Sequence, residues 1–238
     1  MKILAIDTAT ENCSAALLVD GNVRAHEIEL ERGHAERILP IVDSLLAEGH
    51  LALSDLDAIA FGRGPGSFTG VRLAATVTQG LAFGAGLGVA PISDLKAVAQ
   101  RVFGASVADP STARVLVCND ARMSEVYWAC FERGEDGLAR LEGEEQVSKP
   151  GEVRLPPFWT TATAAGRGFT AYATALRAAV PSVFPTSAAG ALLPRATEIA
   201  LLAVPVVAAG RLLPPEAAIP TYLRDNVAHV AQAPKPSG

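Results

Sequence analysis

Residues 62–76 read Gly-Arg-Gly-Pro-Gly-Ser-Phe-Thr-Gly-Val-Arg-Leu-Ala-Ala-Thr, and this stretch decides how the surrounding chain folds. An apolar run over residues 56–61 precedes it and is typical of a strand. Apolar residues then recur every three or four positions up to Ala82, which predicts a helix that ends near residues 84–86. Ser67 or Thr69 provides the N-cap, because a short hydroxyl accepts hydrogen bonds from free N–H groups of the first turn. The stretch therefore predicts a strand, a glycine-rich turn and a helix.

The glycine-rich turn has two interpretations. It could hold an anionic ligand, because glycines let the backbone approach a ligand and a helix N-terminus offers unpaired N–H groups. It could equally form only a sharp connection between strand and helix. The spacing fits neither the Gly-x-x-x-x-Gly-Lys-Ser/Thr phosphate loop nor the Gly-x-Gly-x-x-Gly dinucleotide motif. The spacing alone therefore leaves both interpretations open.

Composition excludes several classes of protein. The chain has 238 residues, 50% of them apolar, which is enough for one large domain or two modest ones. The formal net charge of −5 disfavours unaided binding of tRNA or DNA, because such proteins usually carry a basic surplus. Three widely spaced cysteines and four isolated histidines predict neither a disulfide framework nor a metal site. No secretory signal or membrane-spanning run is recognised, so a soluble cytoplasmic protein is expected.

The remaining pattern predicts two α/β halves. The expected strands cover 2–7, 13–19, 23–31, 57–61, 88–92, 114–119, 125–132 and 158–163, and the expected helices cover 34–46, 67–84, 94–103 and the first half of 195–209. Residues 134–143 are expected to form a charged, exposed segment. A linker rich in Pro, Ser and Thr separates the halves. We expect an N-terminal subdomain over 1–105, a C-terminal subdomain over 106–228 and a disordered tail over 229–238.

Each half begins with a strand, a turn that contains aspartate and a second strand, and this organisation resembles actin, hexokinase and Hsp70-like proteins. The resemblance implies two ribonuclease H-like α/β subdomains, each a mixed sheet with flanking helices. Residues 166–168, Gly-Arg-Gly, are similar to the remnant of an adenosine loop. The residues that resemble the two phosphate loops are Asp7, Thr8, Thr10 and Asp120.

These phosphate loops lack the glycines that a kinase of this class needs, since glycine lets the backbone approach phosphate. Thr8 and Ala9 follow the first aspartate, and Ala121 follows the second. ATP hydrolysis is therefore not expected. Asp7 and Asp120 are interpreted as turn-forming residues that accept hydrogen bonds from nearby backbone N–H groups.

Four stretches narrow the resemblance to one family. They are Ile3–Thr10, Gly62–Val71, Asp120–Met123 with Glu125–Trp128, and Tyr222–Ala228, and they resemble the TsaB (YeaZ) family of bacterial tRNA threonylcarbamoyladenosine biosynthesis proteins. The resemblance covers residues 2 to about 228 and is weakest between about 135 and 200. It implies a non-catalytic scaffold subunit, with no cofactor or metal, that pairs with its paralogue TsaD and, through that complex, with the ATPase TsaE.

The resemblance also implies a reaction for that complex. The threonylcarbamoyl group moves from threonylcarbamoyl-AMP to N6 of the adenosine 3′ of the anticodon, in tRNAs that read codons beginning with adenine. The chain is expected to meet tRNA only as part of the complex. A small-molecule kinase or ATPase of the same fold is the alternative, because fold alone does not decide function. Such an enzyme must bind ATP·Mg without help, whereas a scaffold need not.

In the family, partners dock through the two helices of the N-terminal half, and the same surface forms a homodimer when TsaD is absent. The first helix has more apolar positions than one sheet contact can cover, so part of it should face outward. The second carries small residues that allow close helix packing. The expected interface consists of His34, Ile38, Leu39, Val42, Leu45, Leu46, Val71, Ala74, Ala75, Thr78 and Ala82. The alternative is that this stripe packs inside the chain's own core.

Overall fold

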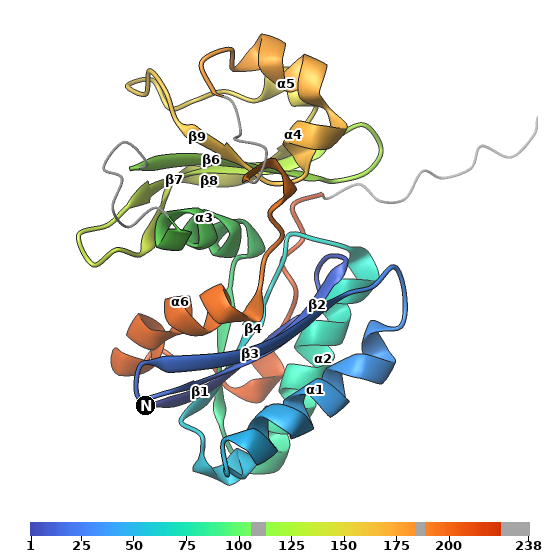
Figure 1. Ribbon diagram of the computed structural model, residues 1–238, viewed down its shortest axis with the longest axis vertical. Coiled ribbons are helices and arrows are strands. Elements are labelled where there is room, and N and C mark those ends of the chain that lie inside the picture. The colour runs from blue at the N-terminus through green and yellow to red at the C-terminus, as the bar shows by residue number, and fades with distance from the viewer. Residues whose placement is uncertain (106–112, 184–188, 225–238) are drawn as a thin grey trace, which may run out of the picture.

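Two mixed sheets with α3 and α6 between them form the frame of the molecule (Figure 1). The computed structural model describes residues 1–105, 113–183 and 189–224, so the expected tail over 229–238 lies outside the described residues. The first sheet has the order β3-β2-β1-β4-β5, and the second has the order β8-β7-β6-β9. In the first sheet β3, β2 and β1 pair antiparallel, and β4 and β5 continue the sheet parallel to β1. In the second sheet β8, β7 and β6 pair antiparallel, and β9 is parallel to β6, so the second sheet repeats the first without a counterpart of β5. The expected fold class, two α/β units that each contain a mixed sheet with flanking helices, is confirmed.

Strands and helices are numbered in the order in which they occur along the chain. Their bounds are β1 (Lys2–Asp7), β2 (Asn12–Val19), β3 (Asn22–Glu29), β4 (Ala58–Gly62), β5 (Gly88–Ile92), β6 (Arg114–Asp120), β7 (Val126–Arg133), β8 (Ala139–Ser148) and β9 (Thr163–Ala165). The helices are α1 (His34–Glu48), α2 (Phe68–Ala85), α3 (Asp94–Ala105), α4 (Gly168–Ala171), α5 (Ala173–Ala179) and α6 (Ala196–Ala208).

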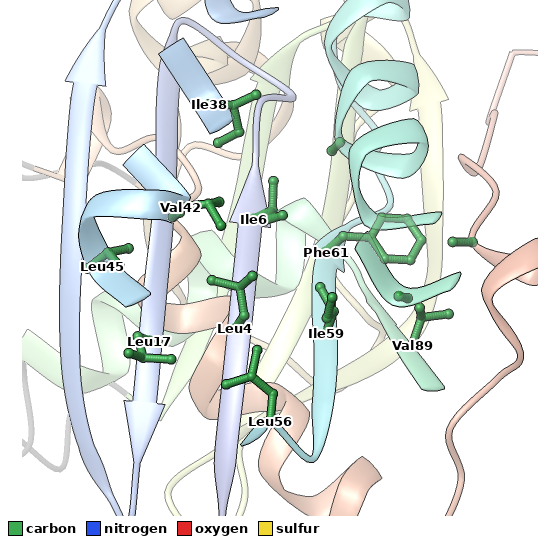
Figure 2. Packing of buried hydrophobic residues seen from close by; sticks show 14 of the residues in the cluster. Leu4, Ile6, Leu17, Ile38, Val42, Leu45, Leu56, Ile59, Phe61 and Val89 are labelled. Carbon is green, nitrogen blue, oxygen red and sulfur yellow. The ribbon is translucent and has the colours of Figure 1, made fainter. Parts of the chain in front are cut away.

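Alternation along β1 gives the first sheet two buried faces. Leu4 and Ile6 point to one face, where they pack with residues of α1 and α2 (Figure 2). Ile3 and Ala5 point to the opposite face, where they pack with residues of α6. Successive side chains of a strand point to opposite faces, so an uninterrupted apolar strand requires helices on both sides. This explains why Ile3, Leu4, Ala5 and Ile6 are all fully buried.

The second sheet is covered in the same way, but by a helix that precedes it in the chain. Val115 and Val117 pack against Val98 and other residues of α3. Leu116 and Cys118 face the opposite side, where they pack with residues of α4 and α5. Helix α6, which follows the second sheet in the chain, packs on the first sheet and also contacts α3. The two halves of the chain therefore meet through α3 and α6.

The weakly patterned second half differs from expectation at one strand and contains one strand that was not expected. Residues 158–162 are not a strand, and β9 begins only at Thr163, where it pairs with β6. The charged segment over residues 134–143 is mostly exposed, as expected, but residues 139–148 also form β8, a strand that was not expected. An edge strand exposes one face and one side to solvent, and the mostly exposed charges of β8 fit that position.

Candidate functional site

A cavity of about 710 Å³ lies between the two halves, and stretches far apart in the sequence line it. Thr8–Glu11 comes from the first loop, Pro65–Val71 from the glycine-rich turn and Asn119–Arg122 from the second loop. The beginning of α1 and the C-terminal segment Thr221–Arg224 complete the wall. Parts of all four stretches that carry the family resemblance therefore line the same cavity.

The glycine-rich turn lies directly on the first loop. A Cβ at Gly66 would lie 2.6 Å from the carbonyl oxygen of Ala9, and one at Gly70 would lie 2.0 Å from that of Thr8. The backbone N–H of Ser67 donates to Ala9 O at 2.7 Å. The hydroxyl of Thr8 donates to the carbonyl oxygen of Gly70 at 2.7 Å. These glycines therefore serve close backbone packing, which seats the start of α2 on the loop.

The aspartates of both loops accept hydrogen bonds from their own turns. Asp7 is fully buried, and its Oδ1 accepts from the N–H of Ala9 at 2.8 Å. Asp120 Oδ1 accepts from the N–H of Arg122 at 2.8 Å and from the hydroxyl of Tyr172 at 3.0 Å. The N–H groups of Ala9 and Arg122 are thus bound within their own turns.

Asp7 has a second buried carboxyl beside it, that of Asp94. Strand β4 lies between β1 and β5 in the sheet, so Asp7 at the end of β1 and Asp94 just after β5 flank its last residue, Gly62. A Cβ at Gly62 would lie 2.5 Å from Asp94 Oδ1 and 2.8 Å from Asp7 Oδ1. Burial raises the pKa of Asp7 to about 6. Burial, followed by the charge of Asp7, raises the pKa of Asp94 well above its usual range.

The second loop has three consecutive residues in the left-handed region. Arg122, Met123 and Ser124 have φ values of 60°, 53° and 60°. A non-glycine residue in this region costs about 1–2 kcal/mol, so the surrounding contacts must hold the loop. Arg224 supplies such contacts, because its guanidinium donates to Ala121 O at 3.1 Å and pairs with the carboxylate of Glu125.

The segment that carries Arg224 also reaches the glycine-rich turn. The N–H of Thr221 donates to Arg63 O at 2.7 Å. Arg72 of α2 donates to the hydroxyl of Tyr222 at 2.7 Å, and its guanidinium lies 3.4 Å from the ring centroid of Phe68. Residues 221–224 therefore connect the glycine-rich turn of the first half to the second loop.

Ion pairs also join the two sides of the cavity. Glu11 of the first loop pairs with Arg122 and with Arg167, each at 3.4 Å. Arg167, from the segment similar to an adenosine loop, also pairs with Glu29 at 3.2 Å. Exposed pairs of this kind contribute at most about 1 kcal/mol each. They place guanidinium groups against protein carboxylates in the space between the loops.

The residues expected at a partner interface are mostly inside the protein, which corrects that expectation. Buried members are Ile38, Val42, Leu45, Leu46, Val71, Ala74, Ala75, Thr78 and Ala82. Because α1 and α2 lie next to each other over the same sheet, the sheet and the neighbouring helix together cover the broad apolar face of α1 (Figures 1 and 2). Leu39 is 45% exposed, and His34 is half-buried with Nε2 2.9 Å from Thr10 O.

The outward side of the two helices carries a different set of residues. This set of exposed residues contains Leu39 from α1 and Thr76, Gly80, Phe83 and Gly84 from α2. Phe83 is 81% exposed, and a Cβ at Gly80 or Gly84 would meet no atom within 4 Å. We call these five residues the outer face of α1 and α2.

Sequence reasoning missed Asp94, Glu11, Arg167 and Arg224 as members of the site. A signal existed for Asp94, because parallel strands end at the same edge of a sheet and a glycine between two such ends leaves room for both carboxyls. No comparable signal identifies the ion pairs, whose partners are separated by 99 to 156 residues.

Some types of site were not found. Among residues 1–105, 113–183 and 189–224, no group of three or more His, Cys, Asp or Glu residues is placed to hold a metal ion. In that same part of the chain, no helix is long and apolar enough to cross a membrane.

Comparison with known proteins gives consistent results. The family model for TsaD, described as tRNA N6-adenosine threonylcarbamoyltransferase, matches residues 28–232. The chain is 42% identical over 238 residues to the tRNA threonylcarbamoyladenosine biosynthesis protein TsaB of Escherichia coli K12, and the match covers 96% of each protein. It is 45% identical over 180 residues to the protein of that name from Haemophilus influenzae, covering 72% of this chain and 74% of the relative.

A solved structure agrees over nearly the whole chain. YeaZ from Pseudomonas aeruginosa has a TM-score of 0.81 and 40% sequence identity to this protein. The superposition covers 93% of this chain and 99% of the other.

Proposed function

We propose that this chain, which belongs to the TsaB family of tRNA threonylcarbamoyladenosine biosynthesis proteins, is a scaffold subunit without a catalytic site of its own. Family membership gives it a role in this modification of tRNA. In the proposed complex it pairs with TsaD and, through TsaD, with TsaE. The complex transfers the threonylcarbamoyl group from threonylcarbamoyl-AMP to N6 of the adenosine 3′ of the anticodon. The match to the family model for TsaD makes the two proposed partners related chains.

The close packing of α2 on the first loop carries the proposal of a non-catalytic subunit. Gly66 and Gly70 bring the start of α2 into contact with Thr8 and Ala9, where an active phosphate loop would need open space. The carboxylate of Asp7 is fully buried under the same contact. A phosphate seated directly on the backbone of Thr8 and Ala9 would have to displace the start of α2, although Thr8–Glu11 also line the cavity.

The isolated chain is therefore expected not to bind ATP·Mg tightly. To seat phosphate on the first loop as a kinase does, binding must break the hydrogen bonds from Ser67 to Ala9 and from Thr8 to Gly70, and it must uncover Asp7. Isothermal titration of the purified chain with ATP·Mg measures this. Micromolar affinity that Asp7→Ala abolishes would contradict the scaffold proposal and favour the kinase or ATPase alternative.

The partner surface of this proposal is the outer face of α1 and α2. Thr76, Gly80 and Gly84 are small and follow one another at intervals of four residues, so a partner helix can approach the backbone of α2 closely. Leu39 of α1 and Phe83 of α2 add exposed apolar side chains. Exposed apolar groups beside small residues are typical of a helix-packing interface. TsaD or a second copy of this chain would occupy it.

Gly80→Arg is expected to leave the monomer folded and to abolish pairing. A side chain at residue 80 meets no atom within 4 Å, and arginine is a better helix former than glycine by about 0.5–1 kcal/mol. In a close helix crossing, however, it places a long charged chain against the partner. Size-exclusion chromatography with TsaD, thermal melting of the variant alone and a reconstituted tRNA-modification assay provide the readouts. We expect loss of the complex, loss of modification and an unchanged or higher melting temperature.

Gly104→Arg is the matched control, because Gly104 is also an exposed helical glycine with no atom within 4 Å of a Cβ. This variant should pair and support modification normally. If Gly80→Arg also retained both, the outer face would not be the interface. If the reconstituted reaction proceeded equally without this chain, the scaffold role itself would be wrong.

A further inference from the structure

We propose that Asp7 and Asp94 share one proton, and that this proton fastens the glycine-rich turn over residues 62–66 to the end of the first sheet. The proposal concerns a buried proton-binding pair and does not depend on the partners of the chain. It rests on how the two carboxyl groups are placed and on which of their oxygens have partners.

Each carboxyl has one oxygen with a backbone partner and one without. Asp7 Oδ1 accepts from the N–H of Ala9, and Asp94 Oδ2 accepts from the N–H of Gly64. Asp7 Oδ2 and Asp94 Oδ1 are both buried, and no donor among the described residues bonds to either. Two such acceptors cannot satisfy each other unless one carries a hydrogen, and a buried acceptor without a donor costs about 1–3 kcal/mol. One proton on Asp94 that is donated to Asp7 satisfies both oxygens.

Nearby charges do not replace this proton. The groups that face the pair are Cys13 from β2, His34 from α1 and Arg63 from the turn, whereas Gly62 of β4 has no side chain. Arg63 directs its guanidinium to Glu145 of β8 at 2.8 Å, and His34 contacts Thr10 O. Neither is hydrogen-bonded to the unpartnered oxygens. Like-charged carboxylates in contact cannot both be ionised without a large cost, so one stays protonated.

The proton holds a turn on which the cavity wall depends. Residues 63–67 make three contacts with other parts of the chain. Ser67 donates to Ala9 O of the first loop, and Arg63 accepts from the N–H of Thr221 in the C-terminal segment. The guanidinium of Arg63 donates to Glu145 of β8. Loss of the proton would place two adjacent negative charges beneath Gly62 and Gly64. The repulsion would push Asp94, and the turn hydrogen-bonded to it through Gly64, away from Asp7 and would loosen all three contacts.

Infrared spectroscopy of the full chain with ¹³C-labelled aspartate tests the shared proton directly. We expect a protonated-carboxyl band from aspartate in the folded wild type at pH 7, far above the pKa of about 3.9 for an ordinary aspartate. Asp94→Asn should remove the band, since its amide donates to Asp7 without a proton. Asp43→Asn, which removes an exposed aspartate of α1, should retain it. Absence of the band from folded wild type would overturn the proposal, even if Asp94→Asn did not fold.

Hydrogen exchange at Ser67, whose N–H donates to Ala9 O of the first loop, tests the fastening of the turn. After correction for the intrinsic rate, protection in the wild type should fall at least tenfold over the pH range in which the band disappears. In Asp94→Asn the side-chain oxygen still accepts from Gly64 and no second charge forms, so protection should not change with pH. Equal loss of protection in both proteins would show that the proton does not hold the turn.

Discussion

Gly70→Ala is expected to destabilise the fold by about 4 kcal/mol or more, at the upper end of single substitutions. The added Cβ would lie 2.0 Å from the carbonyl oxygen of Thr8, 3.0 Å from its carbonyl carbon and 3.2 Å from the Cα of Ala9. All three are backbone atoms, so no side-chain rotation relieves the clash. Either α2 moves away from the first loop or β1 and its loop shift. Denaturant unfolding of the purified variant measures the loss.

Gly80→Ala is the control in the same helix, because a Cβ at residue 80 meets no atom within 4 Å. It should stabilise the monomer by up to about 1 kcal/mol, the difference in helix propensity between alanine and glycine. A loss of stability in Gly70→Ala and a gain in Gly80→Ala would distinguish the steric clash from the effect of helix propensity. A Gly70→Ala variant as stable as the wild type would show that α2 is not seated on the first loop as described.

Local signals predicted the elements around the glycine-rich turn well. The strand before it, the cap and the end of α2 depend on residues within one or two turns of each other. Ser67 caps α2 by accepting from the N–H of Gly70, and Gly86 follows the helix with a φ of 68°. These features follow from backbone geometry and side-chain hydrogen bonding over a few residues, so the sequence contains them directly.

The distribution of burial over α1 could not be predicted in the same way. Periodicity shows which side of a helix is apolar, but not how many neighbours cover that side. Ile38, Val42 and Leu45 are fully or almost fully buried because the sheet and α2 both border α1. The small residues of α2 that pack inward, such as Ala75, have the same spacing as those that face outward, such as Thr76 and Gly80. Only the tertiary arrangement separates the two sets.

The candidate site depends even more on distant contacts. The aspartates at residues 7 and 120 were recognised from their turns, which are local. Asp94 reaches Asp7 only because β4 separates the strands that precede them, and Arg167 meets Glu11 only when the two halves fold against each other. Such contacts join residues with no pattern in common, so charge type and spacing alone do not identify them.

The free energy of unfolding is expected to carry a pH-dependent penalty from Asp7. Burial raises the pKa of this carboxyl to about 6 in the folded protein, against about 3.9 in an unfolded chain. Below about pH 4 the group is protonated in both states and no penalty exists. As the pH rises from about 4 to about 6, the unfolded state releases its proton first, so stability falls. A difference of about two pKa units corresponds to about 3 kcal/mol.

Comparison with Asp7→Asn removes the titration of Asp7 together with its effect on Asp94, whose pKa the charge of Asp7 helps to raise. Asparagine keeps an acceptor for the N–H of Ala9 and brings a donor for Asp94, so it replaces the titrating group with a neutral one. The stability of the variant relative to wild type should rise by about 3 kcal/mol between pH 4 and pH 7. Asp20→Asn should show the opposite trend, because a hydrogen bond from the N-terminal amino group lowers the pKa of Asp20 and stabilises its charged form. Urea denaturation at several pH values measures both differences. A difference between Asp7→Asn and wild type that stayed constant with pH would mean that the carboxyl of Asp7 is ionised as easily in the folded protein as in the unfolded chain.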